Sequence, residues 1–375
     1  MGRSEMGVGY FASPEKNTTS TGLEEAAGKT TWDRRDAEEN TMPEISVIMP
    51  TFNTAADMLK EATESILAQT FTDFEFIIID DCSTEPSSLA YLASITDPRV
   101  IVSRNEVNLG LTKSLNKALE MCRGKYIARM DADDVSLPDR LERQYDYMEK
   151  NPDTILCGSH VQPFGTRNYL HQCDTSDPDL YKITMLFWNP GPIHPTAFFR
   201  HSTLSKHHIR YDEDLIYAQD YGMWTRLYEL GRIHCIPEIL LRYRYHPAQI
   251  SCAKRAEQVR CDHITQKRLL TRLMGEISDA EADYYIQALH SARITKESLA
   301  CYKRLITANR EKGVYDRKKF ELFVGNLISE FVIYEHNISW KKPWRYVILL
   351  KYLPLPFLVE KTIRKIVGRK YEKLF

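Results

Sequence analysis

The chain has 375 residues, 43% hydrophobic and 27% charged, which is ordinary composition for a soluble globular protein with a sizeable core. Its net charge of −1 is uneven: residues 341–375 hold ten Lys/Arg against two Glu, so the remaining acidic body carries −9, which argues against general nucleic-acid binding. Eight scattered cysteines without a C-x-x-C pair exclude a disulfide framework or zinc site and favour a reducing compartment.

Residues 1–42 are rich in Thr, Gly, Glu and Ser and show almost no aliphatic periodicity. Such a segment buries too little apolar surface to offset the entropy of ordering it, so we expect it to be disordered. Met42 directly precedes the first convincing strand and is an alternative start of the protein.

From Pro43 onward, short β-branched runs alternate with segments that carry apolar residues at i, i+3 and i+4. The predicted strands are 45–50, 74–80, 99–103, 125–130 and 154–159. The predicted helices are about 56–69, 87–95, 111–123 and 138–150, the last with Ser136 as its cap and Pro138 in its first turn. This alternation predicts an α/β domain with a doubly wound, mostly parallel sheet, which binds ligands beyond the carboxyl ends of its strands.

The chain beyond residue 160 is less regular, with one clear amphipathic helix at about 217–230. After residue 253 the pattern is helical only, as in QKRLLTRLM and ELFVGNLISEFVIYE. We therefore predict an α/β domain over 43–252 and a C-terminal α-helical extension over 253–375.

Three carboxylates, Asp131, Asp133 and Asp134, directly follow the predicted strand 125–130. In an extended segment Asp131 and Asp133 point to the same side, and two converging carboxylates favour a divalent cation such as Mg²⁺ or Mn²⁺. The alternative is an Asp-rich turn in which Asp134 caps the next helix, and the tripeptide D-x-D alone does not decide between them.

Polar residues also follow the second predicted strand and open the third predicted helix. Asp81 can accept hydrogen bonds from a ribose or a base, or can simply cap a helix. Gly110 opens a helix whose free N–H groups and dipole favour an anion, with Lys113 in the first turn, although glycine before a helix is common.

Two further residues are candidates for chemistry. Asp220, beside Tyr221 and Trp224, is either a general base in a pocket of low polarity or a charge matched to the helix dipole. His246 precedes a proline and is either a ligand or a packed or surface histidine.

The order and spacing of seven motifs resembles the bacterial family 2 glycosyltransferases, which are inverting enzymes of the GT-A fold. The resemblance covers about 43–252 and is carried by ISVIMPTFN, FIIIDDCST, NLGLTKSLNKAL, GKYIARMDADDVSLPDRLERQ, HPTAFFR, AQDYGMWTRL and YRYHPAQIS. It implies transfer of a sugar from a nucleoside-diphosphate sugar, a UDP-sugar first of all, to a glycan or lipid-linked glycan. The pathway that it implies is biosynthesis of cell-surface polysaccharide, lipopolysaccharide or capsule.

The resemblance also implies roles for individual residues. Asp220 corresponds to the catalytic base, although Gln219 stands where the family usually has Glu. The implied metal ligands for Mn²⁺ or Mg²⁺ are Asp131, Asp133 and His246. The implied nucleotide-sugar site comprises Pro50, Thr51, Asn53, Asp81, Asn108, Gly110, Lys113 and Asp131. The cation would act as a Lewis acid on the departing diphosphate, and a single base with in-line attack inverts the anomeric centre.

Two other functions are compatible with a nucleotide-binding α/β domain. A nucleotidyltransferase is expected to carry a Gly-rich loop after its first strand, where this chain has PTFN. A catalytically inactive, nucleotide-binding relative could serve as a membrane-associated assembly partner, but the intact Asp133, Asp220 and His246 argue against it.

The basic tail, residues 340–375, combines its ten Lys/Arg with Trp340, Trp344, Tyr346 and Phe357. Its apolar stretch is broken by Lys351, Pro354 and Pro356, and the chain has no apolar run of about 18 residues and no leader-like start, so we expect a cytoplasmic protein. Basic residues around an aromatic-aliphatic stretch favour peripheral contact with the cytoplasmic face of the inner membrane. The alternative is a terminal helix that docks on the domain with its charges in water.

Overall fold

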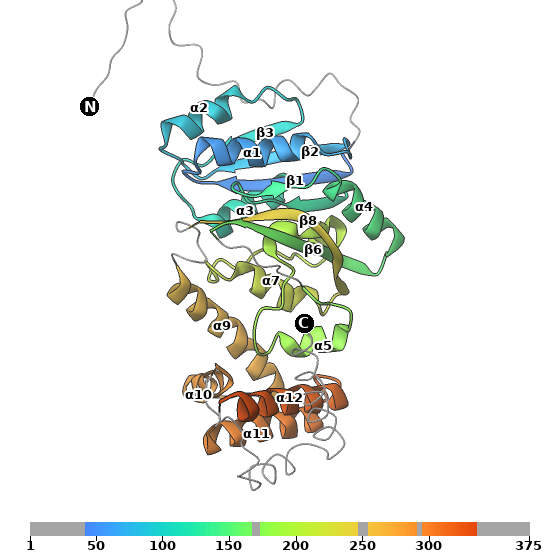
Figure 1. Cartoon of the computed structure of the whole chain (residues 1–375), viewed down its shortest axis with the longest axis vertical. Coiled ribbons are helices and arrows are strands. Elements are labelled where there is room, and N and C mark those ends of the chain that lie inside the picture. The colour runs from blue at the N-terminus through green and yellow to red at the C-terminus, as the bar shows by residue number, and fades with distance from the viewer. Residues whose placement is uncertain (1–41, 167–172, 247–253, 291–294, 336–375) are drawn as a thin grey trace, which may run out of the picture. The chain divides into compact units, whose positions relative to one another are not determined.

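The computed structural model describes residues 42–166, 173–246, 254–290 and 295–335 (Figure 1). The disorder predicted for 1–42 falls, except for Met42, outside these ranges, as does the predicted membrane contact of 340–375. The first half alternates strands and helices in the order β1 (Ile45–Thr51), α1 (Ala56–Leu67), β2 (Phe74–Asp80), α2 (Pro86–Ser94), β3 (Val100–Arg104), α3 (Leu111–Met121), β4 (Tyr126–Arg129), β5 (Val135–Ser136) and α4 (Arg140–Lys150).

Longer strands and short helices complete the α/β part of the chain. They are β6 (Thr154–Gly165), α5 (Pro178–Thr184), the 3-10 helix η2 (His194–Thr196), β7 (Phe198–Arg200), α6 (His201–Lys206), α7 (Gln219–Leu227) and β8 (Arg232–Tyr245).

One eight-stranded sheet has the order β3-β2-β1-β4-β7-β6-β8-β5. Neighbours among β1 to β4 run parallel, as do β6 and β8, whereas β7 and β5 are antiparallel to their partners. The predicted α/β class with a mostly parallel sheet is confirmed. The sequence did not reveal β5 and β7, which have two and three residues, or β8, in which Pro237 and several charges interrupt the apolar pattern.

Helices cover both faces of the sheet, which explains why all seven residues of β1 are buried. On one face Val47 and Met49 belong to the same apolar cluster as Leu59 of α1. On the other face Ile48 belongs to the cluster that holds Leu115 of α3. The loops that follow the carboxyl ends of β1, β2 and β4 carry most of the candidate site residues.

The segment after the acidic cluster differs from its prediction. Ser136 is not a helix cap but a residue of β5, and its hydroxyl accepts a hydrogen bond from Arg140 Nη1 at 3.0 Å. Helix α4 begins at Arg140 with Asp139 as its N-terminal flanking residue, so Asp134 does not cap it either. The short pairing of β5 with β8 holds this segment extended, which delays the start of the helix.

Four helices form the described C-terminal part: α9 (Arg255–Met274), α10 (Asp279–His290), α11 (Lys296–Lys312) and α12 (Arg317–Glu335). Contacts join α9 to α10 and α11, and α11 to α12, and Figure 1 shows α10, α11 and α12 as neighbours. The predicted helical extension is confirmed. Over the described ranges, no helix combines the length and the apolar character needed to span a bilayer. The seven cysteines within these ranges are free thiols.

Replacing Gly124 by alanine should lower the stability of the fold. A Cβ at this position would lie 2.5 Å from the backbone nitrogen of Ser46 in β1, and backbone cannot yield as a flexible side chain does. We expect a loss of about 1–3 kcal/mol in the free energy of unfolding, measured by urea denaturation. An unchanged midpoint and slope would show that the approach of Gly124 to β1 is not tight.

Candidate active site

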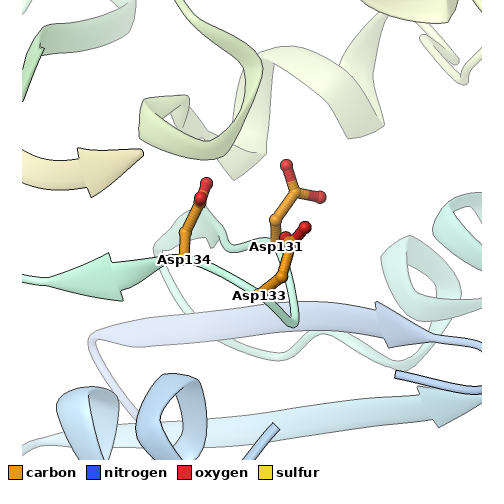
Figure 2. A group of neighbouring side chains, drawn as sticks. All are labelled: Asp131, Asp133 and Asp134. Atoms are coloured by element: carbon orange, nitrogen blue, oxygen red, sulfur yellow. The ribbon is translucent and has the colours of Figure 1, made fainter. Parts of the chain in front are cut away.

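The acidic cluster lies on the turn between β4 and β5, and Figure 2 shows its three carboxylates on the same side of that turn. One oxygen of each of Asp131, Asp133 and Asp134 lies within 4.8 Å of the others. The backbone is not extended here, because Ala132 and Asp133 form the turn and Asp134 N lies 3.5 Å from Asp131 O. The prediction that strand alternation would bring Asp131 and Asp133 together is therefore wrong in geometry. A turn gathers all three carboxylates, including Asp134.

Asp134 is the most deeply buried of the three. Its Oδ1 accepts a hydrogen bond from Arg244 N at 2.8 Å, while Oδ2 has no hydrogen-bond partner in the described structure. Burial, followed by the charges of Asp131 and Asp133, raises the pKa of Asp134 well above its usual range. A buried carboxylate oxygen without a partner is costly, so this donor set of hard oxygens fits Mg²⁺ or Mn²⁺.

His246 lies beside this cluster at the end of β8. Its Nε2 is 2.9 Å from Asp133 Oδ2, so the imidazole is in hydrogen-bonding contact with one carboxylate of the group. The set of mutually close ligand atoms comprises the three aspartates, and His246 is outside it within the described residues. The arrangement places His246 where it can orient Asp133.

Arg129, the last residue of β4, is a residue of the candidate site that the sequence analysis did not single out. Its side chain is only 2% exposed and forms an ion pair with Asp131. Its Nε and Nη1 have no hydrogen-bond partners in the described structure. Burial raises the pKa of Asp131, and the positive charge of Arg129 opposes that rise. An arginine inside the predicted buried strand YIARM was the signal that could have revealed it.

Asp220 lies in the first turn of α7, where Asn189 Nδ2 donates a hydrogen bond to its Oδ2 at 3.0 Å. Burial raises the pKa of Asp220, against the hydrogen bond from Asn189 and the charge of Arg129. The charge of Asp220 in turn raises the pKa of Asp131, so the α7 carboxylate is within electrostatic reach of the acidic turn. Nothing in the local sequence pointed to Asn189. The neighbouring Gln219 is buried, and its Oε1 has no partner within the described ranges.

A buried aromatic pair lies near the same arginine. His194 Nε2 and the Tyr211 hydroxyl are 2.9 Å apart. Burial, reinforced by the charge of Arg129, lowers the pKa of His194 well below its usual range, so this imidazole is neutral. His194 belongs to the HPTAFFR motif, and its burial assigns it to the support of the site.

The residues predicted for the nucleotide lie on the loops that follow β1 and β2 and precede α3. Asp81 Oδ1 accepts hydrogen bonds from Asn105 Nδ2 at 2.7 Å and Leu109 N at 2.8 Å, and Oδ2 accepts one from Gly110 N at 2.8 Å. Gly110 has a φ of +85°, which favours glycine. Asp81 therefore accepts hydrogen bonds from the amides that lead into α3, and these bonds hold that loop in place.

The other predicted nucleotide residues border the same loops. Asn108 Nδ2 donates to Asp81 O at 3.2 Å, and Lys113 Nζ lies 3.8 Å from Glu213 Oε2. Asn53 Oδ1 accepts hydrogen bonds from the amides of Thr84 at 2.7 Å and Glu85 at 3.0 Å, which ties the loops after β1 and β2 together.

Pro50 and Thr51 are the last two residues of β1 and are buried. The Thr51 hydroxyl donates to Thr54 Oγ1 at 3.0 Å. Because β1 lies between β2 and β4 in the sheet, the predicted nucleotide residues and the acidic turn share one edge of it.

Comparison with known proteins agrees with this architecture. Residues 46–207 match the family model described as glycosyl transferase family 2. An uncharacterised glycosyltransferase of Methanocaldococcus jannaschii is 38% identical over 211 residues, which cover 55% of this chain and 72% of the relative. The amylovoran biosynthesis glycosyltransferase AmsE of Erwinia amylovora is 31% identical over 210 residues, which cover 53% of this chain and 76% of the relative.

The fold is also similar to that of a solved structure, S. aureus TarS in complex with UDP-GlcNAc. The TM-score is 0.51 at 19% sequence identity, over 71% of this chain and 81% of that chain. The resemblance found in the motifs is confirmed by these relatives: the chain belongs to glycosyltransferase family 2 and is a glycosyltransferase.

Proposed function

We propose that the protein transfers a sugar from a nucleoside-diphosphate sugar to a hydroxyl of a glycan or lipid-linked glycan, with inversion at the anomeric carbon. The observation that carries this proposal is the half-buried carboxylate of Asp220 on α7, which is held by Asn189 and lies within electrostatic reach of the three carboxylates of the acidic turn. Asp220 is thereby available as a base for the acceptor. The separate group of carboxylates on the acidic turn is available to hold a cation at the departing diphosphate.

Asp220 is the proposed general base. It takes the proton of the acceptor hydroxyl while that oxygen forms a bond to the anomeric carbon, and the bond to the diphosphate oxygen breaks with its electron pair leaving on the diphosphate. Attack from the side opposite the leaving group inverts the configuration. Asn189, whose amide donates to Asp220 Oδ2, fixes the orientation of the carboxylate toward the incoming hydroxyl.

Asp131, Asp133 and Asp134 are the residues that would hold Mn²⁺ or Mg²⁺, with His246 as the neighbour that orients Asp133. Such a cation, when bound, supplies Lewis-acid stabilisation of the negative charge on the diphosphate. The chain contributes Arg129, whose ion pair with Asp131 opposes the rise in the pKa of Asp131 that burial causes.

The nucleotide part of the donor is proposed to lie along the loops after β1 and β2. Pro50, Thr51, Asn53, Asn108 and Lys113 border this edge, and Asp81 and Gly110 shape it. Since both oxygens of Asp81 accept hydrogen bonds within the protein, the proposed contact of Asp81 with a base would use its remaining lone pairs.

The proposed pathway is the biosynthesis of a cell-surface polysaccharide. It is supported by the 31% identity to AmsE, whose name assigns that relative to amylovoran biosynthesis. A UDP-sugar is the first donor to test.

The test is incubation of the full chain with Mn²⁺ and a panel of UDP-, GDP- and dTDP-sugars, with and without methyl glycosides as acceptors. Release of nucleoside diphosphate together with a glycosylated product of inverted configuration supports the proposal. Pyrophosphate release from a nucleoside triphosphate would instead indicate a nucleotidyltransferase. Nucleotide binding without turnover of any donor would indicate a catalytically inactive relative.

Removal of the basic tail should abolish binding to anionic membranes. Each Lys or Arg near an anionic surface contributes about 1 kcal/mol, and residues 341–375 carry ten. We expect the full chain to sediment with phosphatidylserine-containing liposomes at low salt, and a chain ending at Ser339 to remain in the supernatant. Equal partitioning of the two proteins would contradict membrane contact and favour docking of the tail on the protein.

A further inference from the structure

A half-buried carboxylate outside the family match, Asp262, belongs to α9, the helix that packs against α7, which carries Asp220. Helix α9 packs against α7, and Thr265 Oγ1 is 3.9 Å from the position that a Cβ on Gly222 would occupy. One turn further along the same face, Gln266 Nε2 donates to Phe187 O at 2.6 Å, two residues before Asn189. Because side chains three and four residues apart share a helix face, Asp262 faces the region where Asn189 meets Asp220.

The electrostatics of Asp262 agree with this placement. Burial raises the pKa of Asp262 to about 7, and the charge of Asp220 raises it further than the charge of Arg255 lowers it. Tyr221, next to Asp220 in α7, also has its pKa raised by the charge of Asp262. These are the charged and titratable groups that surround Asp262 from its own helix and from α7.

Asp262 has no hydrogen bond or ion pair in the described part of the chain. A half-buried carboxylate that the chain leaves without a partner is available to bind another group. Because its helix face packs on α7, which carries the proposed base, the acceptor is the group that Asp262 is placed to meet. Sugar hydroxyls are donors that suit a carboxylate, and adjacent hydroxyls on one ring can reach two neighbouring carboxylates.

We propose that Asp262 binds the acceptor: it accepts a hydrogen bond from a second hydroxyl of the sugar whose first hydroxyl is deprotonated by Asp220. This inference rests on the proposed function and adds an acceptor-binding residue supplied by the C-terminal helical region. It also specifies the acceptor class, a saccharide with a free hydroxyl close to the one that is glycosylated.

The experiment compares the wild-type chain with Asp262→Ala, Asp262→Asn and the control Glu257→Gln, which removes a carboxylate paired with Lys254 on the same helix. The acceptor is the methyl glycoside that the wild-type chain uses best among those of glucose, galactose, mannose and N-acetylglucosamine. Asp262→Ala should raise KM for this glycoside about 10-fold or more, the loss expected for one hydrogen bond to a charged group. KM for the donor and the rate of donor hydrolysis by water should change less than about 2-fold. Asp262→Asn should be intermediate, and Glu257→Gln should match wild type.

Other outcomes would overturn the inference. An unchanged KM for the glycoside in a folded Asp262→Ala protein, or equal increases in the KM values of donor and glycoside, would show that Asp262 does not bind the acceptor. Failure of the wild-type chain to release nucleotide from any donor would be a different result, because it contradicts the proposed function itself.

A second measurement tests the contact between the two carboxylates without activity. Carboxyl ¹³C NMR of the Asp220→Asn protein should show the pKa of Asp262 falling toward the ordinary aspartate range, because a neighbouring negative charge has been removed. An unchanged pKa would place Asp262 away from the base and exclude the proposed role.

Discussion

Replacing Asp220 by asparagine should lower the rate of sugar transfer by at least about 10²-fold, the lower bound expected for loss of a general base. Asparagine has the size of aspartate and keeps the hydrogen bond to Asn189, but it cannot accept the proton of the acceptor. Donor binding, measured by calorimetry or by the KM for the donor, should therefore change little. Asp146→Asn, which removes an exposed carboxylate on α4, is the matched control and should retain full activity.

The pH dependence of transfer provides a second view of the same residue. The base must be ionised, so the rate falls as the pH drops through the pKa of Asp220. Because burial raises that pKa, the fall should begin at a higher pH than for an exposed aspartate. The activity that remains in Asp220→Asn should not show this fall in rate at low pH. A comparable loss of donor affinity and rate in the variant would instead assign Asp220 a structural role.

Replacing Asp133 by alanine should abolish nearly all Mn²⁺-dependent turnover while the fold persists. Asp133 contributes an oxygen to the cluster and is partly exposed, with 23% of its side chain accessible, so its loss leaves no buried cavity. Removing one of three mutually repelling carboxylates should not lower the melting temperature of the metal-free protein. We expect Mn²⁺ affinity, measured by the free-ion EPR signal, to fall at least about 10-fold, as it does even when an outer partner of a ligand is lost.

Two controls define this prediction. Asp146→Ala should bind Mn²⁺ as the wild-type chain does. Wild-type activity that persists in EDTA, or unchanged Mn²⁺ binding by Asp133→Ala, would remove the metal from the proposed mechanism.

Asp134→Asn offers a further comparison. It keeps the bond from Arg244 but withdraws negative charge from the buried oxygen that lacks a partner, so Mn²⁺ affinity should fall while the fold is retained.

The sequence by itself determined the α/β class and the parallel strands β1 to β4 of the sheet. Strands 45–51 and 74–80 are mostly apolar, with Ser46 and Glu75 as internal exceptions, because helices cover both faces of the sheet. The acidic cluster and Asp220 were also found in the sequence, because the first follows a strand directly and the second lies at the start of an amphipathic helix. Both signals are contained within a few consecutive residues.

The tertiary structure alone decided which side chains meet. Asn189 reaches Asp220 over 31 residues of sequence, and Arg244 reaches Asp134 over 110. Ser136 was taken for a helix cap because its pairing partner in β8 lies more than a hundred residues away. Asp134 joined the acidic group because the backbone turns at Ala132 and Asp133, where alternation predicted extended chain. Periodicity reports the face on which a residue lies, whereas the partner on that face depends on how distant segments pack, and only the folded chain contains that information.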